Sequence, residues 1–212
     1  MKRWWNLLPM LALIVLPSVA RAQVFGQWTT ARILPVNGHS FGAQLELSDH
    51  VAALMGNLRL SFYPNVDFGF QGGVTRTQVE GSNIGTVRLA ADLKAGALRT
   101  TGGAPLDLSF GAFVGLEAGD RLGRLVIGPS LVASRGVTMN GVERFIPYAG
   151  VQARYAQFSF HESQRNDFSL PLRLGCQFPV VQGFRAIGEV QFRAGDEIDD
   201  HFAYGFGVDF DI

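Results

Sequence analysis

Large apolar residues alternate with small or polar residues along much of the chain. The last eleven residues, 202–212, show this most clearly, with large apolar side chains on one face and Ala, Gly or Asp on the other. Strict alternation of this length predicts a β-strand with one apolar face. The apolar positions of this terminal run are Phe202, Tyr204, Phe206, Val208, Phe210 and Ile212.

The same alternation recurs in the segments 87–96, 106–117, 169–178 and 184–193. Each is about as long as the roughly 9–11 residues that a tilted strand needs to cross a bilayer. A soluble periplasmic β-sandwich, the main rival fold, usually carries long polar side chains on its outward face. In a membrane barrel the apolar face meets lipid and the other face lines the lumen. The repeated pattern therefore favours a closed antiparallel transmembrane β-barrel, an all-β fold.

Segments rich in Pro, Gly and Asn separate several of these runs. Tyr63–Val66, Arg99–Pro105 and Pro179–Gly183 are expected to be tight connections at one rim. More charged segments are expected to form polar loops at the other rim: 77–83, 118–123, 161–167 and 195–200. Ten strands follow, at about 39–48, 53–63, 66–77, 85–98, 106–117, 123–135, 145–160, 168–178, 184–194 and 201–212. An eight-strand barrel that starts later remains an alternative, because Asp49-His50 is a weak turn.

The N-terminal residues divide into two further segments. Residues 1–22 are typical of a cleavable signal peptide: Lys2 and Arg3 precede an apolar run, and Ala20-Arg21-Ala22 supplies the cleavage pattern. Residues 23–38 lack alternation and are expected to be a lead-in that lies in the periplasm or folds into the lumen. The barrel then spans 39–212, and the expected location is the outer membrane.

Charge and cysteine content exclude several classes of protein. Three of the 18 basic residues leave with the signal peptide, so the 18 acidic residues exceed the bases by three and nucleic-acid binding is not expected. The single cysteine, Cys176, excludes an intrachain disulfide and falls on the lipid-facing register. No cofactor or metal is expected, because the acidic run 196–201 lacks the ligand spacing of a known calcium loop.

Charges of both signs fall on the inward register and are the candidate functional residues. Unpaired charges in a narrow lumen of low dielectric are costly, so we expect them to pair. They are Arg59, Arg88, Asp92, Lys94, Asp107, Glu117, Arg154, Arg173, Arg185, Glu189, Arg193 and Asp209. A largely closed polar lumen with a structural or surface role is the leading hypothesis. The alternative is a narrow channel for small polar or anionic solutes, since Arg173, Arg185 and Arg193 outnumber the acids on the last inward faces.

The signal segment, the ten-residue repeats and the terminal aromatic run 202–212 resemble those of the small Gram-negative outer-membrane barrels of the OmpA, OmpX and OmpW types. The terminal run is similar to the signal that the barrel-assembly machinery recognises, although this chain ends in Ile212 where the family usually ends in Phe. The resemblance implies outer-membrane lipids and lipopolysaccharide as surroundings, and the assembly machinery as a partner during biogenesis. It covers nearly the whole mature chain and implies no functional residues.

Enzymatic hypotheses rest on two short motifs, and we expect no catalytic residues. His161-Glu162-Ser163 resembles the His-x-Ser pairing of lipid A deacylase barrels, but the residues that follow depart from that family. Asp199-Asp200-His201 has the Asp-x-His spacing of outer-membrane proteases, but no second Asp pair stands in 77–83. An envelope hydrolase therefore stays a minor alternative. Aromatic residues near predicted strand ends are expected to form interfacial girdles: Tyr63, Phe68, Phe145, Tyr148, Phe158 and Phe160.

Overall fold

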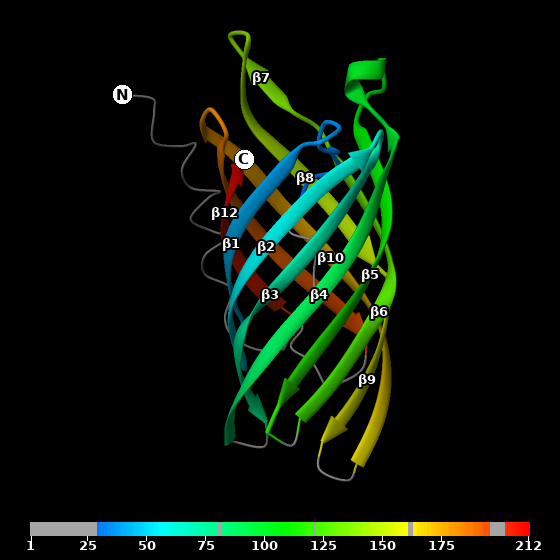
Figure 1. Ribbon diagram of the computed structural model, residues 1–212, viewed down its shortest axis with the longest axis vertical. Coiled ribbons are helices and arrows are strands. Elements are labelled where there is room, and N and C mark those ends of the chain that lie inside the picture. The colour runs from blue at the N-terminus through cyan, green and yellow to red at the C-terminus, as the bar shows by residue number, and fades with distance from the viewer. Residues whose placement is uncertain (1–28, 80–81, 121, 161–162, 196–201) are drawn as a thin grey trace, which may run out of the picture.

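The computed structural model describes residues 29–79, 82–120, 122–160, 163–195 and 202–212, and these form a closed β-barrel (Figure 1). The elements are β1 (His39–Leu47), β2 (Val51–Tyr63), β3 (Val66–Val79), β4 (Ser82–Leu98), the 3₁₀ turn η1 (Thr100–Gly102), β5 (Asp107–Gly119), β6 (Leu122–Ser134), β7 (Val137–Met139), β8 (Val142–Gln152), β9 (Arg154–Phe160), β10 (Ser163–Val181), β11 (Phe184–Gly195) and β12 (Phe202–Asp211). The signal-peptide prediction lies outside the described residues.

Ten strands surround the lumen, as the alternation predicts. β8 and β9 are separated only by Ala153 and together fill one position between β6 and β10, while β7 pairs with β8 alone. β1 pairs with both β2 and β12, so the sheet has no open edge. The eight-strand alternative is wrong because the Asp49-His50 turn does form: the Ser48 amide donates to the Val51 carbonyl at 2.8 Å, and the β1–β2 hairpin is complete.

The two rims differ in a way that corrects the loop prediction. We call the rim that holds His39 and Asp211 the terminal rim and the opposite one the distal rim. Most residues of the expected distal loops lie in strands, because cross-strand pairing continues to Val79 with Ser82, Gly119 with Leu122 and Phe160 with Ser163. Polar side chains at a strand end tolerate water, so the loss of apolar alternation does not end the backbone ladder.

The terminal rim carries the longer described connections. η1 follows β4, and the β7–β8 hairpin stands above the rim in Figure 1. Asn140 and Gly141 at the tip of that hairpin both have positive φ, at 54° and 74°. This is the backbone of a type I′ turn, which matches the right-handed twist of the paired strands. The N-terminal segment 29–38 also enters the barrel at this rim.

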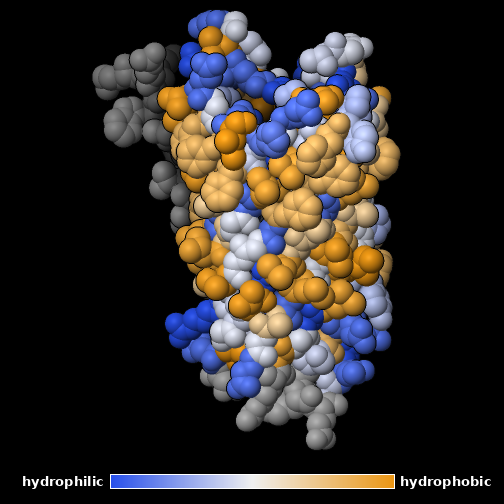
Figure 2. Space-filling model, viewed as in Figure 1, coloured by the Kyte–Doolittle hydropathy of each residue, from blue (hydrophilic) through white to orange (hydrophobic). Residues whose placement is uncertain are grey.

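The outer wall is apolar across the middle of the barrel. Leu54, Val74 and Leu89 are 58%, 59% and 57% exposed, and Figure 2 shows apolar side chains over the visible wall with hydrophilic residues gathered toward both ends. A water-soluble protein rarely exposes so continuous an apolar surface, whereas a transmembrane barrel carries an outward apolar band. Within the described residues, no helix has the length and apolar character that a membrane span requires.

The terminal aromatic run lies on this outer wall, along the seam that closes the barrel. β12 pairs with β1 on one side and β11 on the other. Phe184 and Phe210 have ring centroids 4.8 Å apart, and the rings of Phe192 and Phe202 meet edge-on at 5.1 Å. Cross-strand aromatic pairs of this kind add to backbone pairing. The run predicted as an assembly signal is therefore also part of the seam.

Candidate functional site: the barrel lumen

The inward faces of the strands place most of the predicted charges in the lumen. Arg88, Lys94, Glu117, Arg154, Arg173 and Glu189 are each at most 3% exposed. Arg59, Asp92 and Asp107 are also buried on this face, while Arg185 and Asp209 are partly exposed at the terminal rim. The side chain of Arg193 lies outside the described residues. Four further buried charges that the sequence analysis did not select complete the set: Glu46, Asp67, Arg124 and Asp167.

An ionic cluster lies in the lumen toward the distal rim. Arg88 on β4 lies between two carboxylates, 3.3 Å from Oε2 of Glu46 on β1 and 3.4 Å from Oε2 of Glu117 on β5. The Thr86 hydroxyl donates to Glu117 Oε1 at 2.6 Å. Arg124 on β6 adds a second cation, with its guanidinium 4.4 Å from the centroid of the Phe158 ring. Buried charges persist in proteins when they are paired and hydrogen-bonded, as this cluster is.

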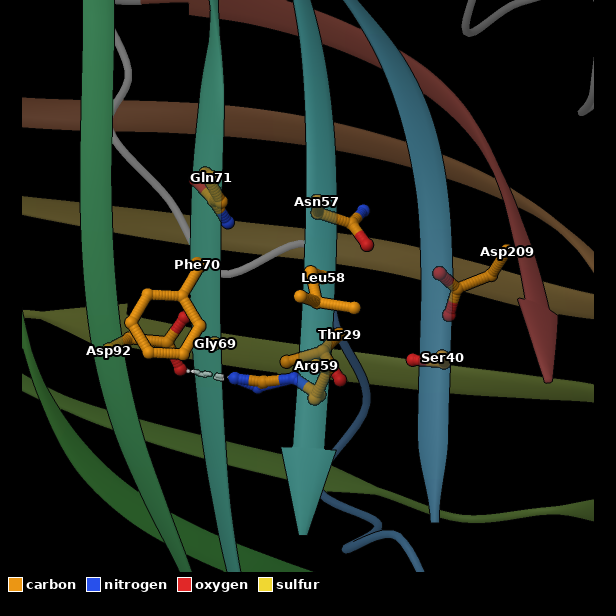
Figure 3. A pocket seen from close by; sticks show the side chains of 10 residues that line it. All are labelled: Thr29, Ser40, Asn57, Leu58, Arg59, Gly69, Phe70, Gln71, Asp92 and Asp209. Atoms are coloured by element: carbon orange, nitrogen blue, oxygen red, sulfur yellow. Dashed lines mark hydrogen bonds and ion pairs between the residues drawn. The ribbon is translucent and has the colours of Figure 1, made fainter. Parts of the chain in front are cut away.

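A second ionic layer lies nearer the terminal rim. Arg59 on β2 forms an ion pair with Asp92 on β4 across the intervening strand β3, as Figure 3 shows. Lys94, two residues along β4, lies with its ammonium 3.2 Å from Asp67 Oδ2 on β3. A cavity of only about 20 Å³ remains beside Arg59, and Thr29 of the N-terminal segment borders it. This layer therefore joins three adjacent strands to the segment that enters the lumen.

The segment 29–34, which belongs to the described part of the predicted lead-in, is bound inside the barrel. Thr30 and Ala31 are 4% and 2% exposed, and Ala31 packs with Val132, Tyr148 and Ile187 of the inner wall. The Ala31 amide donates to Ser134 Oγ at 3.1 Å. A short backbone segment without its own ladder needs such partners for its polar groups. The lumen wall supplies them.

Lys94 makes the largest share of these contacts. Its ammonium donates to the Thr30 and Arg32 carbonyls at 3.1 and 2.6 Å, and to the Thr29 hydroxyl at 3.1 Å. Its partner Asp67 accepts from the Leu34 amide at 3.0 Å. One buried ion pair of the wall thus makes four hydrogen bonds to the segment 29–34. We call Lys94 and Asp67 the latch.

Arg32 fastens the same segment to the rim. Its guanidinium donates to both carboxylate oxygens of Glu143, at 2.8 and 2.6 Å, and to Asp107 Oδ2 at 3.2 Å. The hydrogen bonds and negative charge of Glu143 raise the pKa of the Arg32 guanidinium, despite partial desolvation. The bidentate geometry is the strong form of arginine–carboxylate pairing. The segment is therefore tied to β5 and to the β7–β8 hairpin as well as to β4.

Tyr148 and Phe158 correct the prediction of interfacial girdles. Both side chains face the lumen, because β8 and β9 continue the inward register of Gln152 and Arg154. The Tyr148 hydroxyl donates to Glu189 Oε2 at 2.6 Å, and Phe158 lies under Arg124. Tyr63, in contrast, is 63% exposed at the terminal rim. The side chain of Phe160 lies outside the described residues.

Gly175 provides a test of this inner packing. It pairs directly with Tyr148 across the β8–β10 ladder, and a Cβ at Gly175 would overlap the Tyr148 ring. Gly175→Ala is expected to lower the free energy of unfolding by about 1–3 kcal/mol, as overpacking does. The matched control is Gly188→Ala on β11, where a Cβ meets no atom within 4 Å. Urea unfolding of the refolded barrel measures both; equal stability of the two variants would contradict the packing argument.

Acidic side chains lie near two of the three arginines on which the expected preference for anions rests. Arg173 interacts electrostatically with Glu189. Arg185 lies 3.6 Å from Asp209 Oδ2 and also pairs with Asp211. Two of the three arginines on which the anion hypothesis rested are therefore matched by acids. Among the described residues, no group of three or more His, Cys, Asp and Glu side chains is arranged to hold a metal ion.

The remaining space is divided by the N-terminal segment. A cavity of about 740 Å³ lies on its β8, β10 and β11 side, and one of about 410 Å³ lies between it and the β4–β5 connection. Both are bordered by the same four residues, 32–35. Deeper in the lumen, the buried amides of Gln44 and Gln152 have no hydrogen-bond partner within the described protein. Buried polar groups of this kind usually bind ordered water.

The residues of both enzymatic motifs lie mainly outside the described part of the chain. His161, Glu162 and the run 196–201 are among the residues not described. Ser163 begins β10 and is exposed at the distal rim, paired with Phe160. Cys176, on β10, carries a free thiol.

Comparison with known proteins supports the fold without naming a family. No protein-family model matches the sequence, and a comparison with curated proteins gives no match either. Among solved structures, the β domain of the Bordetella autotransporter BrkA has a TM-score of 0.52 and 13% identity, with 84% of this chain and 100% of that chain covered. At this identity the similarity concerns the fold alone.

Two further outer-membrane proteins are more distant in structure. The N-terminal β-barrel domain of Pseudomonas aeruginosa OprF has a TM-score of 0.36 and 13% identity, covering 84% of this chain and 98% of that chain. A loop-deletion mutant of Vibrio cholerae OmpT has a TM-score of 0.39 and 10% identity, covering 76% of this chain. The match spans about half of that protein, 54% of its length. The fold and the apolar outer wall together define the class of the transmembrane β-barrel protein.

Proposed function

We propose that the chain is a non-enzymatic barrel of the outer membrane, with a structural or surface role and a lumen closed to solutes. The observation that carries this proposal is the occupied lumen. An ionic cluster around Arg88 narrows the distal half, and the latched segment 29–34 lies across the half nearer the terminal rim. A ten-strand barrel has only modestly more interior than an eight-strand one, whose interior side chains fill it. With the segment in place, we propose that the narrowed lumen offers no continuous path for solutes.

The proposed surroundings follow from the wall and the rims. The apolar band faces lipids and lipopolysaccharide, and the terminal rim faces the periplasm, where a chain with an even strand number has both ends. Kinship with the OmpA-, OmpX- and OmpW-type barrels is part of the proposal, supported by the terminal aromatic run and the strand repeats. That run on β12 is proposed as the feature that the barrel-assembly machinery recognises. No nucleic acid is proposed as a partner.

Conductance tests the closed lumen. The refolded wild-type barrel, inserted in a planar bilayer at 1 M KCl, is expected to give no single-channel steps. Insertion is verified independently by heat-modifiability, since a closed barrel often keeps a compact mobility in SDS until it is heated. A folded, inserted barrel that conducts steadily would overturn the proposal.

A narrow channel for small polar solutes is the second candidate. The unpartnered amides of Gln44 and Gln152 favour it, because they are suited to a row of bound water through the midsection. The balanced charges predict weak ion selectivity for such a channel, in place of the anion preference expected from the arginines alone. Reversal potentials in a KCl gradient measure this: a value near zero fits the balanced lumen, and a strongly anion-selective value contradicts it.

A further inference from the structure

The outer wall carries an apolar groove on the side formed by β6, β8 and β10. Its volume is about 280 Å³, near the lower end of the roughly 300–1,000 Å³ of small-molecule sites. The groove differs from the cavities of the lumen because its apolar side chains belong to the outward register. It is bordered by Leu131, Ala133, Ala149, Gly150, Val151, Leu172, Arg173, Leu174 and Phe192.

The strand register explains the depression. Ala133 on β6 pairs with Ala149 on β8, so two of the smallest side chains lie next to each other on the lipid-facing surface. A row of larger side chains crosses the same strands two residues away: Leu131 pairs with Val151, and Val151 with Leu172. Phe192 on β11, which pairs with Leu172, continues that row. Small residues beside a raised row leave a furrow in the wall.

A positive charge lies at the terminal-rim end of the furrow. Arg135 follows β6 directly, two residues beyond Ala133, and its amide donates to the Pro147 carbonyl at 3.2 Å. Pro147 precedes Ala149 by two residues, so the furrow and Arg135 are about 7 Å apart along the strands. Arg135 is exposed, and its guanidinium makes no ion pair within the described part of the chain. An unpaired cation at the edge of an apolar band is suited to a lipid phosphate.

We propose that this groove seats one acyl chain of a phospholipid whose phosphate binds Arg135. The inference rests on the proposed location in a membrane. A phospholipid is the partner that supplies an extended apolar chain and an anion at this spacing, on a surface that faces the bilayer. Lipid tails gain little from leaving other tails for an apolar wall. Preferential binding of this lipid over the surrounding lipids therefore has to come from the depth of the groove and the charge of Arg135.

Native mass spectrometry of the refolded mature barrel tests the proposal. The protein is held in detergent micelles with added phosphatidylglycerol, and the number of lipids retained on gentle activation is measured. The wild type is expected to retain one lipid. Ala149→Phe fills the furrow and is expected to abolish retention. Ala43→Phe, which places the same ring on the outward face of β1, is the matched control and is expected to retain the lipid.

The phosphate contact is tested separately. Arg135→Gln is expected to weaken retention about fivefold, the effect of about one basic residue near an anionic lipid. Arg144→Gln removes an exposed arginine that borders the cavity of about 740 Å³ beside the N-terminal segment, and this variant is expected to retain the lipid as the wild type does. Heat-modifiability confirms that each variant is folded. Equal retention by Ala149→Phe and Ala43→Phe, or none by the folded wild type, would overturn the groove; equal retention by the two arginine variants would overturn the phosphate contact. A conducting wild type would count against the closed lumen and leave these measurements intact.

Discussion

Lys94→Met is expected to open the lumen to ions. The substitution keeps the length of the side chain and removes the ammonium that binds three oxygens of the segment 29–32. If the segment stayed in place, Asp67 and two backbone carbonyls would be buried without their cation. Leaving one partner of a buried ion pair uncompensated costs about 3–5 kcal/mol. Release of the segment into water avoids this cost, so the barrel is expected to conduct where the wild type does not.

Fluorescence reports the same event independently. Trp28 directly precedes the latched segment and is the only tryptophan of a chain cleaved after Ala22. Acrylamide is expected to quench Trp28 more strongly in Lys94→Met than in the wild type. Arg99→Met is the control. It removes an exposed positive charge that borders the cavity of about 410 Å³ beside the segment, and it leaves Lys94 and Asp67 unchanged. A closed Lys94→Met barrel with unchanged quenching would show that the latch does not hold the segment.

Arg88→Leu is expected to cause the largest loss of stability among substitutions in the lumen. Arg88 is 1% exposed and is the cation between Glu46 and Glu117, whose side chains are equally buried. The substitution leaves both carboxylates without this partner. The free energy of unfolding is expected to fall by about 3–5 kcal/mol, measured by urea titration of the refolded barrel.

The control for Arg88→Leu is Arg76→Leu, because Arg76 is exposed on the outward face of β3. A surface charge away from such contacts is expected to change stability by no more than about 0.5 kcal/mol. The triple variant Arg88→Leu, Glu46→Gln, Glu117→Gln is expected to recover much of the loss, since neutral amides need no cation. Similar losses for Arg88→Leu and Arg76→Leu would contradict the role of the distal ionic cluster.

Substitutions in the two ionic layers are expected to have different effects, because the partners of Arg88 and Lys94 differ. Arg88 on β4 connects strands of the wall, because its partners lie on β1 and β5. When Arg88 is lost, these partners are fixed in the barrel and cannot move into water. Lys94 connects the wall with the N-terminal segment. The cost of losing its charge is therefore avoided when the ten residues 29–38 move away from the lumen wall. We therefore expect Arg88→Leu to act mainly on stability and Lys94→Met mainly on conductance.

Sequence reasoning predicted the strands well because the bilayer imposes a simple rule on them. Each strand has to present apolar residues to lipid at every second position, and the ten predicted segments match the ten wall positions to within a few residues at most ends. The largest difference lies at the distal rim, where β10 begins five residues before its predicted segment and β4 begins three residues before its own. There the strands leave the apolar band and polar residues continue the ladder.

The sequence shows which residues face inward, but it does not show which of them pair with each other. Glu46, Asp67 and Arg124 lie within predicted strands, and Asp167 immediately precedes one, so the same alternation could have selected all four. Tyr148 and Phe158 were placed at the interface because aromatic residues near strand ends are common there, although the register of Arg154 puts them inside. The pairing of charges depends on which strands face each other across the lumen, and a one-dimensional pattern holds no such information.

The sequence by itself determined a closed barrel of alternating strands, because that pattern is local and each strand obeys it separately. Only the tertiary structure decided what the lumen contains. The segment 29–38 has no periodicity, and its position depends on Lys94, Asp67 and Ser134, which are 33–103 residues away along the chain. Contacts of such separation depend on how β3, β4 and β6 curve around the segment in the closed barrel, which no local pattern in the sequence specifies.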